Sequence, residues 1–135
     1  MDEERLELTR VWLIKAQHDL AAAKRLAQGN DPVLDVAIYH CQQAAEKALK
    51  GLLVYRNIPF EKIHDLKVLI GLALPVAPTL SGLIEKADHL TDYATEYRYP
   101  GELLEPDAAE FSQALDDAET IYRTILTLLP GMQLG

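Results

Sequence analysis

One candidate site follows a helical spacing between residues 40 and 50. Four donor side chains recur at steps of three, four and three residues, so they would line up along one side of a helix, with Gln42 and Glu46 beside them: His40, Gln43, Lys47 and Lys50. Imidazole, amide and ammonium donors in such a row could bind a phosphate group. The alternative, which the spacing alone favours, is a solvated helix face on which Glu46 and Lys50 form an i, i+4 ion pair.

A second candidate site surrounds Arg98, the only arginine of an acidic stretch. Three tyrosines flank it in the sequence: Tyr93, Tyr97 and Tyr99. Arginine can hold a phosphate through two hydrogen bonds and tyrosine can stack on a base, so this group indicates a nucleotide pocket. The spacing alone favours packing instead, in which Tyr97 turns inward and the other tyrosines cover the end of a helical bundle with wet hydroxyls. Arg98 would then pair with Glu96 or Glu102.

The third candidate is His64, which is followed by Asp65 and Leu66 at an expected helix start. The positive end of a helix dipole disfavours a protonated histidine, which leaves a neutral imidazole able to act as a base or a donor. The alternative is that His64 caps the helix or packs under the loop. We favour this alternative because no orienting partner is visible nearby in the sequence.

Other familiar chemistry is not indicated. The sequence contains no glycine-rich phosphate loop, no Cys-x-x-Cys, no His-Glu-x-x-His and no Gly-x-Ser-x-Gly motif. No two of the four histidines share a helix at the i, i+3 or i+4 spacing of a preformed metal site. We therefore expect neither a metal nor a cofactor.

Helical periodicity covers most of the chain and predicts the elements that would position these groups. The expected helices span about residues 4–28, 32–56, 65–74, 80–97 and 106–129. Gly29 should end the first helix in a left-handed conformation, and Asp31 should cap the second, with Pro32 as its first residue. Thr79 or Ser81 should cap the fourth.

The expected fold is an all-α, four- to five-helix up-and-down bundle with four long helices and one short helix. The second helix carries an alanine-rich stripe, which lets neighbouring helices approach closely. No alternating pattern of β-branched residues competes with the helical signal. At 135 residues, the chain can bury one hydrophobic core, so we expect a single domain over residues 1–135.

Composition and charge limit the surroundings and the partners. The single cysteine, the acidic first residues and the absence of a long apolar run favour the reducing cytoplasm, with no secretion signal and no membrane span. The formal net charge is −8, and residues 80–120 carry two Lys or Arg against eleven Asp or Glu. This balance argues against a generic surface for duplex DNA but leaves room for a small phosphate site.

Three motifs in order resemble the HEPN domain (higher eukaryotes and prokaryotes nucleotide-binding). They are residues 42–53, residues 64–66 and residues 97–101, and the resemblance extends over about residues 8–128. It implies a helical bundle that usually forms homodimers and often works with a minimal nucleotidyltransferase in a two-gene module of the toxin–antitoxin type. It also implies metal-free RNA cleavage in many members, by an arginine followed four to six residues later by a histidine and paired across the dimer.

Arg98 matches the arginine of that ribonuclease motif, but residues 99–105 contain no histidine. RNA cleavage without a metal needs a general acid or base near neutral pKa, which arginine cannot supply. We therefore expect a nucleotide- or RNA-binding module, and partner of a nucleotidyltransferase, rather than an enzyme. The second hypothesis is an active ribonuclease toxin that pairs Arg98 with His64. The third is a structural dimer with no ligand.

Overall fold

The computed structural model describes residues 2–98, 100 and 104–134, and this part of the chain is all-helical, without a strand. Its elements in order are α1 (Glu3–Leu26), α2 (Leu34–Tyr55), α3 (Leu66–Ala73), the 3₁₀ helix η1 (Pro78–Leu83), α4 (Ile84–Thr91), the 3₁₀ helix η2 (Asp92–Ala94) and α5 (Ala108–Thr127). The all-α bundle is confirmed. Three of its helices are long and two are short, so the prediction of four long helices was wrong.

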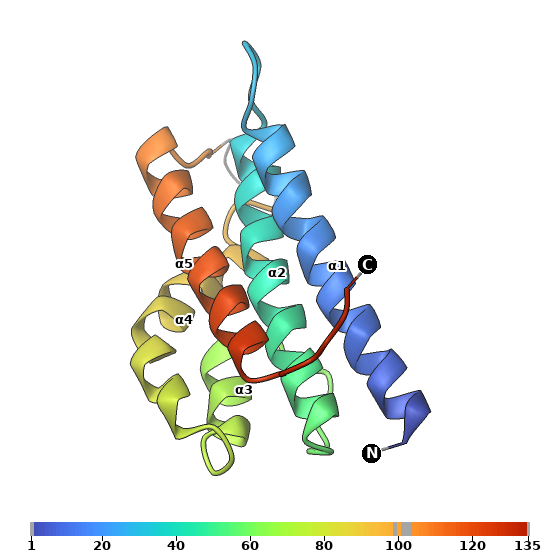
Figure 1. The fold of residues 1–135 in the computed structure, drawn as a ribbon. Coiled ribbons are helices and arrows are strands. Elements are labelled where there is room, and N and C mark those ends of the chain that lie inside the picture. Colours follow the sequence, from blue (N-terminus) through green and yellow to red (C-terminus); the bar gives the residue numbers. More distant parts are fainter. Residues whose placement is uncertain (1, 99, 101–103, 135) are drawn as a thin grey trace.

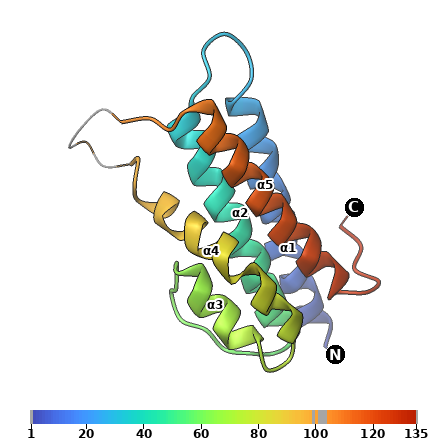
Figure 2. The same ribbon diagram turned by 90° about the vertical axis from the view of Figure 1, so that its left-hand side faces the viewer.

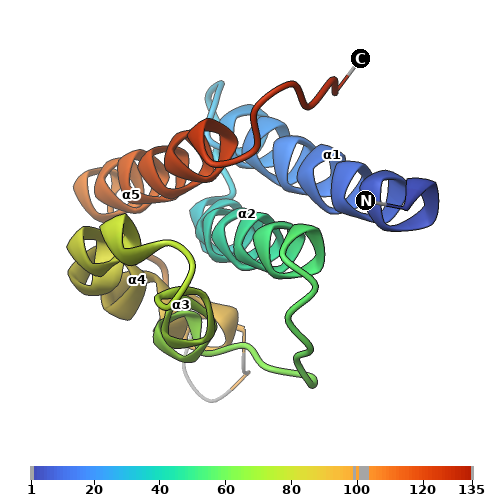
Figure 3. The same ribbon diagram turned by 60° about the horizontal axis from the view of Figure 1, so that its bottom comes forward.

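Helix α2 forms the centre of the bundle. It contacts α1, α3, α4 and α5, and Figure 3 shows α1 and α5 on one side of it and α3 and α4 on another. Figures 1 and 2 show α1 and α5 running beside α2, whereas α3 and α4 pack along its lower half. Polar side chains on different sides of α2 therefore meet different neighbouring elements.

Small side chains allow α1 to lie close to α2. The predicted stripe is fully buried at Ala37, Cys41, Ala44 and Ala48. The two helices approach closely at Gly51, where an added Cβ would lie 3.2 Å from the Cβ of Trp12 and 3.3 Å from the Cδ2 of Leu13. This short separation brings polar groups of α1 within hydrogen-bonding distance of α2.

Side-chain caps fix several helix starts. The carboxylates of Asp2, Asp65 and Asp107 accept hydrogen bonds from the first turns of α1, α3 and α5, respectively. Gly29 has a φ of +85°, so its predicted left-handed conformation is confirmed, but α1 already ends at Leu26 with Ala27 as its C-cap. The predicted Asp31 cap is wrong, because α2 starts at Leu34 after Val33, which forms no side-chain cap. The Val33 N–H instead donates to the Leu26 carbonyl at 2.8 Å, so the connection is held by the end of α1.

The predicted fourth helix is divided into η1, α4 and η2 and stops before Tyr97, which lies in a turn. Neither Thr79 nor Ser81 caps α4, whose N-cap is Leu83. At the other end, the Thr95 hydroxyl donates to the Asp92 carbonyl at 3.4 Å, a local bond that competes with helix continuation. The periodic pattern therefore could not detect where the backbone leaves the helix.

Within the described residues, no helix has the length and apolar character needed to cross a membrane.

Candidate functional site

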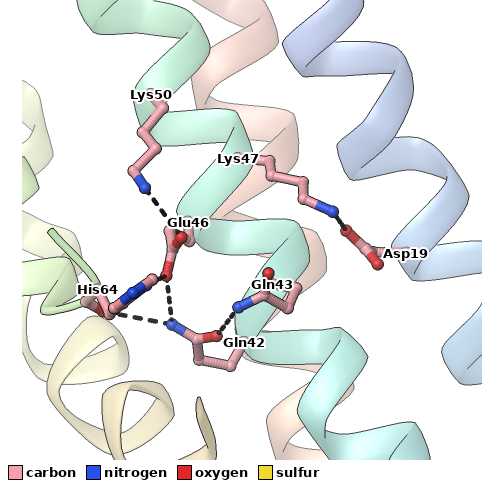
Figure 4. Close-up of polar contacts among 7 residues, drawn as sticks. All are labelled: Asp19, Gln42, Gln43, Glu46, Lys47, Lys50 and His64. Carbon is pink, nitrogen blue, oxygen red and sulfur yellow. Dashed lines mark hydrogen bonds and ion pairs between the residues drawn. The ribbon is translucent and has the colours of Figure 1, made fainter. Parts of the chain in front are cut away.

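One side of α2 carries a buried polar network centred on Glu46. Its Oε2 accepts a hydrogen bond from Lys50 Nζ at 3.0 Å, and its Oε1 lies 3.1 Å from both Gln42 Nε2 and His64 Nδ1 (Figure 4). The Glu46 and Lys50 side chains are only 5% and 8% exposed. The predicted i, i+4 ion pair is thus confirmed, but the expectation of a solvated face is wrong.

The network stabilises the charged form of Glu46. Burial by itself would raise the pKa of this carboxyl, but hydrogen bonds from Gln42, Lys50 and His64 outweigh burial and lower the pKa below its ordinary value. The ammonium of Lys50 also lies 5.8 Å from the ring centroids of Trp12 and Phe60. The ammonium of Lys50 therefore contacts a carboxylate and two aromatic rings inside the protein.

His64 has an orienting partner after all. Its Nδ1 contacts Glu46, 18 positions earlier in the chain, and its backbone carbonyl accepts a hydrogen bond from Gln42 Nε2 at 3.3 Å. Gln43 Nε2 donates to Gln42 Oε1 at 2.7 Å, which adds Gln43 to the same network. The imidazole of His64 remains 69% exposed. These contacts fasten the loop before α3 to the centre of α2.

A second network joins α2 to α1 through Asp19. Its Oδ2 accepts a hydrogen bond from Lys47 Nζ at 2.7 Å, and its Oδ1 lies 2.7 Å from His40 Nδ1. The Asp19 side chain is 9% exposed. Figure 4 shows Lys47 reaching to Asp19 on α1, on the side of α2 away from the Glu46 network. His40 and Lys47 thus share a face as predicted, and they share a carboxylate as well.

The sequence reasoning missed Asp19, although a signal was present. Asp19 lies three residues after Ala16 and four before Ala23, both of which are fully buried. A carboxylate at this helical spacing falls on or beside the apolar stripe, and a carboxylate there needs a cationic or hydrogen-bonding partner. That requirement would have indicated a polar contact between helices.

His40 also lines a pocket that contains Arg98. The pocket has a volume of about 250 Å³ and is lined by Asp35, Val36, Tyr39, His40, Tyr97 and Arg98. The Cζ of Arg98 lies 4.1 Å from the ring centroid of Tyr39. The Tyr39 and His40 rings meet edge to face, with their centroids 5.6 Å apart. The fold thereby brings an arginine and a histidine from distant parts of the chain into one pocket.

Tyr93 and Tyr97 hold the segment that carries Arg98 against α5. Their hydroxyls donate to the Glu110 carboxylate at 2.7 and 2.9 Å, and their rings stack with centroids 6.1 Å apart. Burial and the adjacent Glu110 carboxylate raise the pKa of Tyr97 to about 12. The expectation of a wet hydroxyl is therefore wrong for Tyr93, whereas Tyr97 packs partly inward as expected. Tyr99 and Glu102 lie outside the described residues.

The chain belongs to the HEPN domain family, because the family model matches residues 9–128. The helical bundle is similar to the crystal structure of TT1696 from Thermus thermophilus, with 32% identity and a TM-score of 0.74 over 88% of this chain and 96% of that one. It also shares its fold with ST0689, described as an archaeal HEPN homologue, at 23% identity and a TM-score of 0.69 over 90% of this chain and 97% of that one. The family resemblance predicted from the three motifs is confirmed.

A further relative carries a functional description. The chain is 27% identical over 142 residues to a protein of Methanocaldococcus jannaschii named "Putative toxin MJ1304". The match covers 92% of this chain and 90% of that protein, so the similarity extends over nearly the whole of both.

Proposed function

We propose that this protein is a HEPN module that binds single-stranded RNA or a nucleotide through a phosphate held at Arg98. The observation that carries the proposal is the position of the Arg98 guanidinium over the Tyr39 ring, with Cζ 4.1 Å from the ring centroid, inside the pocket that also contains His40. A cation–π contact of this kind does not use the N–H donors at the edges of the guanidinium. Those edges match the two oxygens of a phosphate.

The pocket favours one phosphate over several. Its volume of about 250 Å³ is below the range of about 300–1,000 Å³ usual for whole small-molecule ligands, so a phosphate with its ribose fits better than a complete nucleoside triphosphate. Asp35 also lines the pocket and would repel additional negative charge. A phosphodiester or a monophosphate, each with one phosphorus, suits this combination of arginine and carboxylate.

The other predicted binding residues take supporting roles in this proposal. Lys47 and Lys50 are paired with carboxylates, while Gln43 and His64 belong to the Glu46 network. These groups hold α1 and the loop before α3 against α2, and Tyr97 positions the Arg98 segment through Glu110. Arg98 and Tyr39 then provide the direct contacts to the phosphate and its nucleoside.

The proposal includes a homodimer and a minimal nucleotidyltransferase as partners in a module of the toxin–antitoxin type. Membership of the HEPN family and the likeness to a protein named as a toxin support this part. Light scattering should give twice the chain mass of 15.1 kDa at micromolar concentration. A monomeric mass at that concentration would contradict the dimer.

Fluorescence anisotropy with a labelled single-stranded RNA tests the binding site. Loss of a charge-assisted contact costs about 1.5–3 kcal/mol, so Arg98→Ala should weaken binding by roughly 10- to 150-fold. Arg123→Ala is the matched control, because Arg123 lies on α5, its side chain is 63% exposed and it pairs with Glu119. Equal losses in the two variants would show a nonspecific charge effect. If neither RNA nor nucleoside monophosphates bind the wild type, the structural dimer without a ligand replaces this proposal.

A further inference from the structure

Arg5, near the start of α1, is a half-buried arginine without an anionic partner in the part of the chain that the structure describes. Its Nε is buried and meets no hydrogen-bond acceptor there, and its guanidinium forms no ion pair with these residues. Arg10 and Arg123, by contrast, pair with glutamates. A donor that loses water without gaining an acceptor costs free energy, so Arg5 would bind an acceptor that a ligand brings.

A pocket of about 750 Å³ lies beside Arg5, at the end of the bundle where α1 begins and α2 ends (Figure 1). Most of its wall is apolar and consists of Leu8, Val54, Ile58, Pro59 and Phe60. The loop after α2 is fixed in place, because the Ile58 N–H donates to the Leu53 carbonyl at 2.8 Å. An apolar pocket of this size with a few polar groups in its wall is typical of a binding site.

Asn57 adds a second donor group to the pocket wall. Its φ is +57°, a left-handed conformation that asparagine adopts more readily than most residues, and the chain turns there directly after α2. Its side-chain amide forms no hydrogen bond to any other described residue. The donors that line the pocket are therefore a guanidinium and an amide, and both match the acceptor oxygens of a carboxylate.

Two carboxylates in the pocket wall limit the negative charge that it can accept. Asp2 and Glu4 are exposed, and Asp2 Oδ1 already accepts a hydrogen bond from the Arg5 backbone N–H at 2.7 Å. Water and salt screen these exposed charges, whereas a bond to the half-buried guanidinium forms away from water. One carboxylate therefore gains more from Arg5 than it loses to repulsion. A row of phosphates, as in RNA, would add repulsion without adding such a bond.

Exposed apolar side chains extend the pocket along α1. Leu8 is 49% exposed, and Val11, one turn further along the same side of the helix, is 39% exposed. Apolar area of this kind beside a pocket marks an interaction surface. A segment of polypeptide can cover both the pocket and Val11, whereas a compact small molecule in the pocket would leave Val11 in water.

We propose that this pocket is a docking site for a partner protein that inserts a segment with one aspartate or glutamate beside large apolar side chains. The carboxylate binds Arg5, with Asn57 as a second donor, and the apolar side chains fill the pocket. The site shares no residue with the Arg98 pocket. Val54 follows Tyr39 by 15 positions on α2, about 22 Å at 1.5 Å per residue, so both sites can be occupied at once.

A display library of random linear peptides, panned against the full chain, supplies the probe. Enriched peptides should carry Asp or Glu within a few positions of Leu, Ile or Phe, and fluorescence anisotropy measures the affinity of an amidated synthetic peptide from this set. Arg5→Gln should weaken its binding by roughly 10- to 150-fold, the factor for the loss of a charge-assisted hydrogen bond. Arg25→Gln is the matched control, because Arg25 is exposed in the last turn of α1, and it should bind like wild type.

Two further changes test the charge of the bound group. Glu4→Gln removes a repelling carboxylate from the pocket wall and should tighten binding by up to about fivefold. Replacing the carboxylate of the peptide with an amide should weaken its binding to wild type as much as Arg5→Gln does. The same replacement should change little in Arg5→Gln, because both changes remove one contact. Thermal midpoints within a few degrees of wild type show that the variants are folded.

Several results would overturn this inference. If panning enriches no peptide, or only peptides that bind Arg5→Gln as tightly as wild type, the pocket does not recognise a carboxylate. Weaker binding by Glu4→Gln would indicate a cationic ligand instead. Arg5→Gln should bind labelled single-stranded RNA like wild type, and a loss equal to that of Arg98→Ala would assign the pocket to RNA. A failure of RNA binding at Arg98 leaves the docking site in place, because the two sites are separate.

Discussion

Removal of the Glu46 carboxylate should destabilise the protein more than any exposed charge change. In Glu46→Ala, Lys50 would keep its buried position, with a side chain 8% exposed, but would lose its carboxylate partner at 3.0 Å. Gln42 Nε2 would lose an acceptor in the same step. Breaking a buried ion pair by removing one partner costs about 3–5 kcal/mol, a large share of the roughly 5–15 kcal/mol that stabilises a typical domain.

Urea unfolding followed by circular dichroism measures this loss. The matched control is Glu7→Ala, which removes an exposed i, i+3 pair with Arg10 whose side chains are 63% and 37% exposed, so it should cost less than about 1 kcal/mol. A cycle that adds Lys50→Met and the double variant isolates the pair itself. The double variant should be more stable than the sum of the single losses predicts, because neither charge is then left alone.

The result that would refute this reasoning is a loss below about 1 kcal/mol for Glu46→Ala, equal to that of the exposed control. Additive losses in the cycle would also refute it, because Lys50 would then be indifferent to the carboxylate. Either outcome would mean that Lys50 reaches water in solution and that the network does not fasten the loop before α3.

Three further predictions concern stability and reactivity. Gly51→Ala should lower the thermal midpoint, because its Cβ would lie 3.2 Å from the Cβ of Trp12. Gly71→Ala meets no atom within 4 Å, so it should raise the midpoint through the higher helix propensity of alanine, which is up to about 1 kcal/mol. Scanning calorimetry measures both midpoints. Because the pKa of Glu46 is lowered in the folded protein, its ionisation stabilises the fold fully above the ordinary pKa of 4.5, and this stabilisation is lost as the pH falls through the lower folded pKa. The free energy of unfolding from urea titrations should therefore fall between pH 7 and pH 3 by an amount that Glu46→Gln does not show. Burial raises the pKa of Cys41 to about 12, so the native thiol should resist a disulfide reagent at pH 8 and react only after unfolding; fast labelling of the native protein would contradict this.

The parts of the fold that the sequence predicted are those set by local chemistry. Gly29 adopts the left-handed backbone that its residue type favours, so this conformation could be inferred from the sequence alone. The division of the predicted fourth helix could not be inferred in this way. Besides the local bond from Thr95 to Asp92, Tyr93 and Tyr97 are anchored here by Glu110, a carboxylate on another helix.

In the candidate site, too, the sequence predicted local features but not the contacts between helices. Spacing placed His40 and Lys47 on one helix face, which is a local property. Their shared partner Asp19 lies 21 and 28 positions away, and the Glu46 partner of His64 lies 18 positions away. Pairing between helices depends on which faces pack together, so the sequence identified the polar groups but not the networks that they form.

The two networks on α2 differ in the hydrogen-bonding capacity that they leave open. Both oxygens of Glu46 are occupied, and the ammonium of Lys50 is enclosed between this carboxylate and two aromatic rings. His40 uses only Nδ1 in its contact with Asp19, and it lines a pocket. A polar group whose donors and acceptors are all bonded inside the protein can stabilise the fold, but it cannot form a further hydrogen bond to a ligand. By this criterion Glu46 and its partners stabilise the fold, whereas His40 keeps one ring nitrogen for a ligand of the pocket.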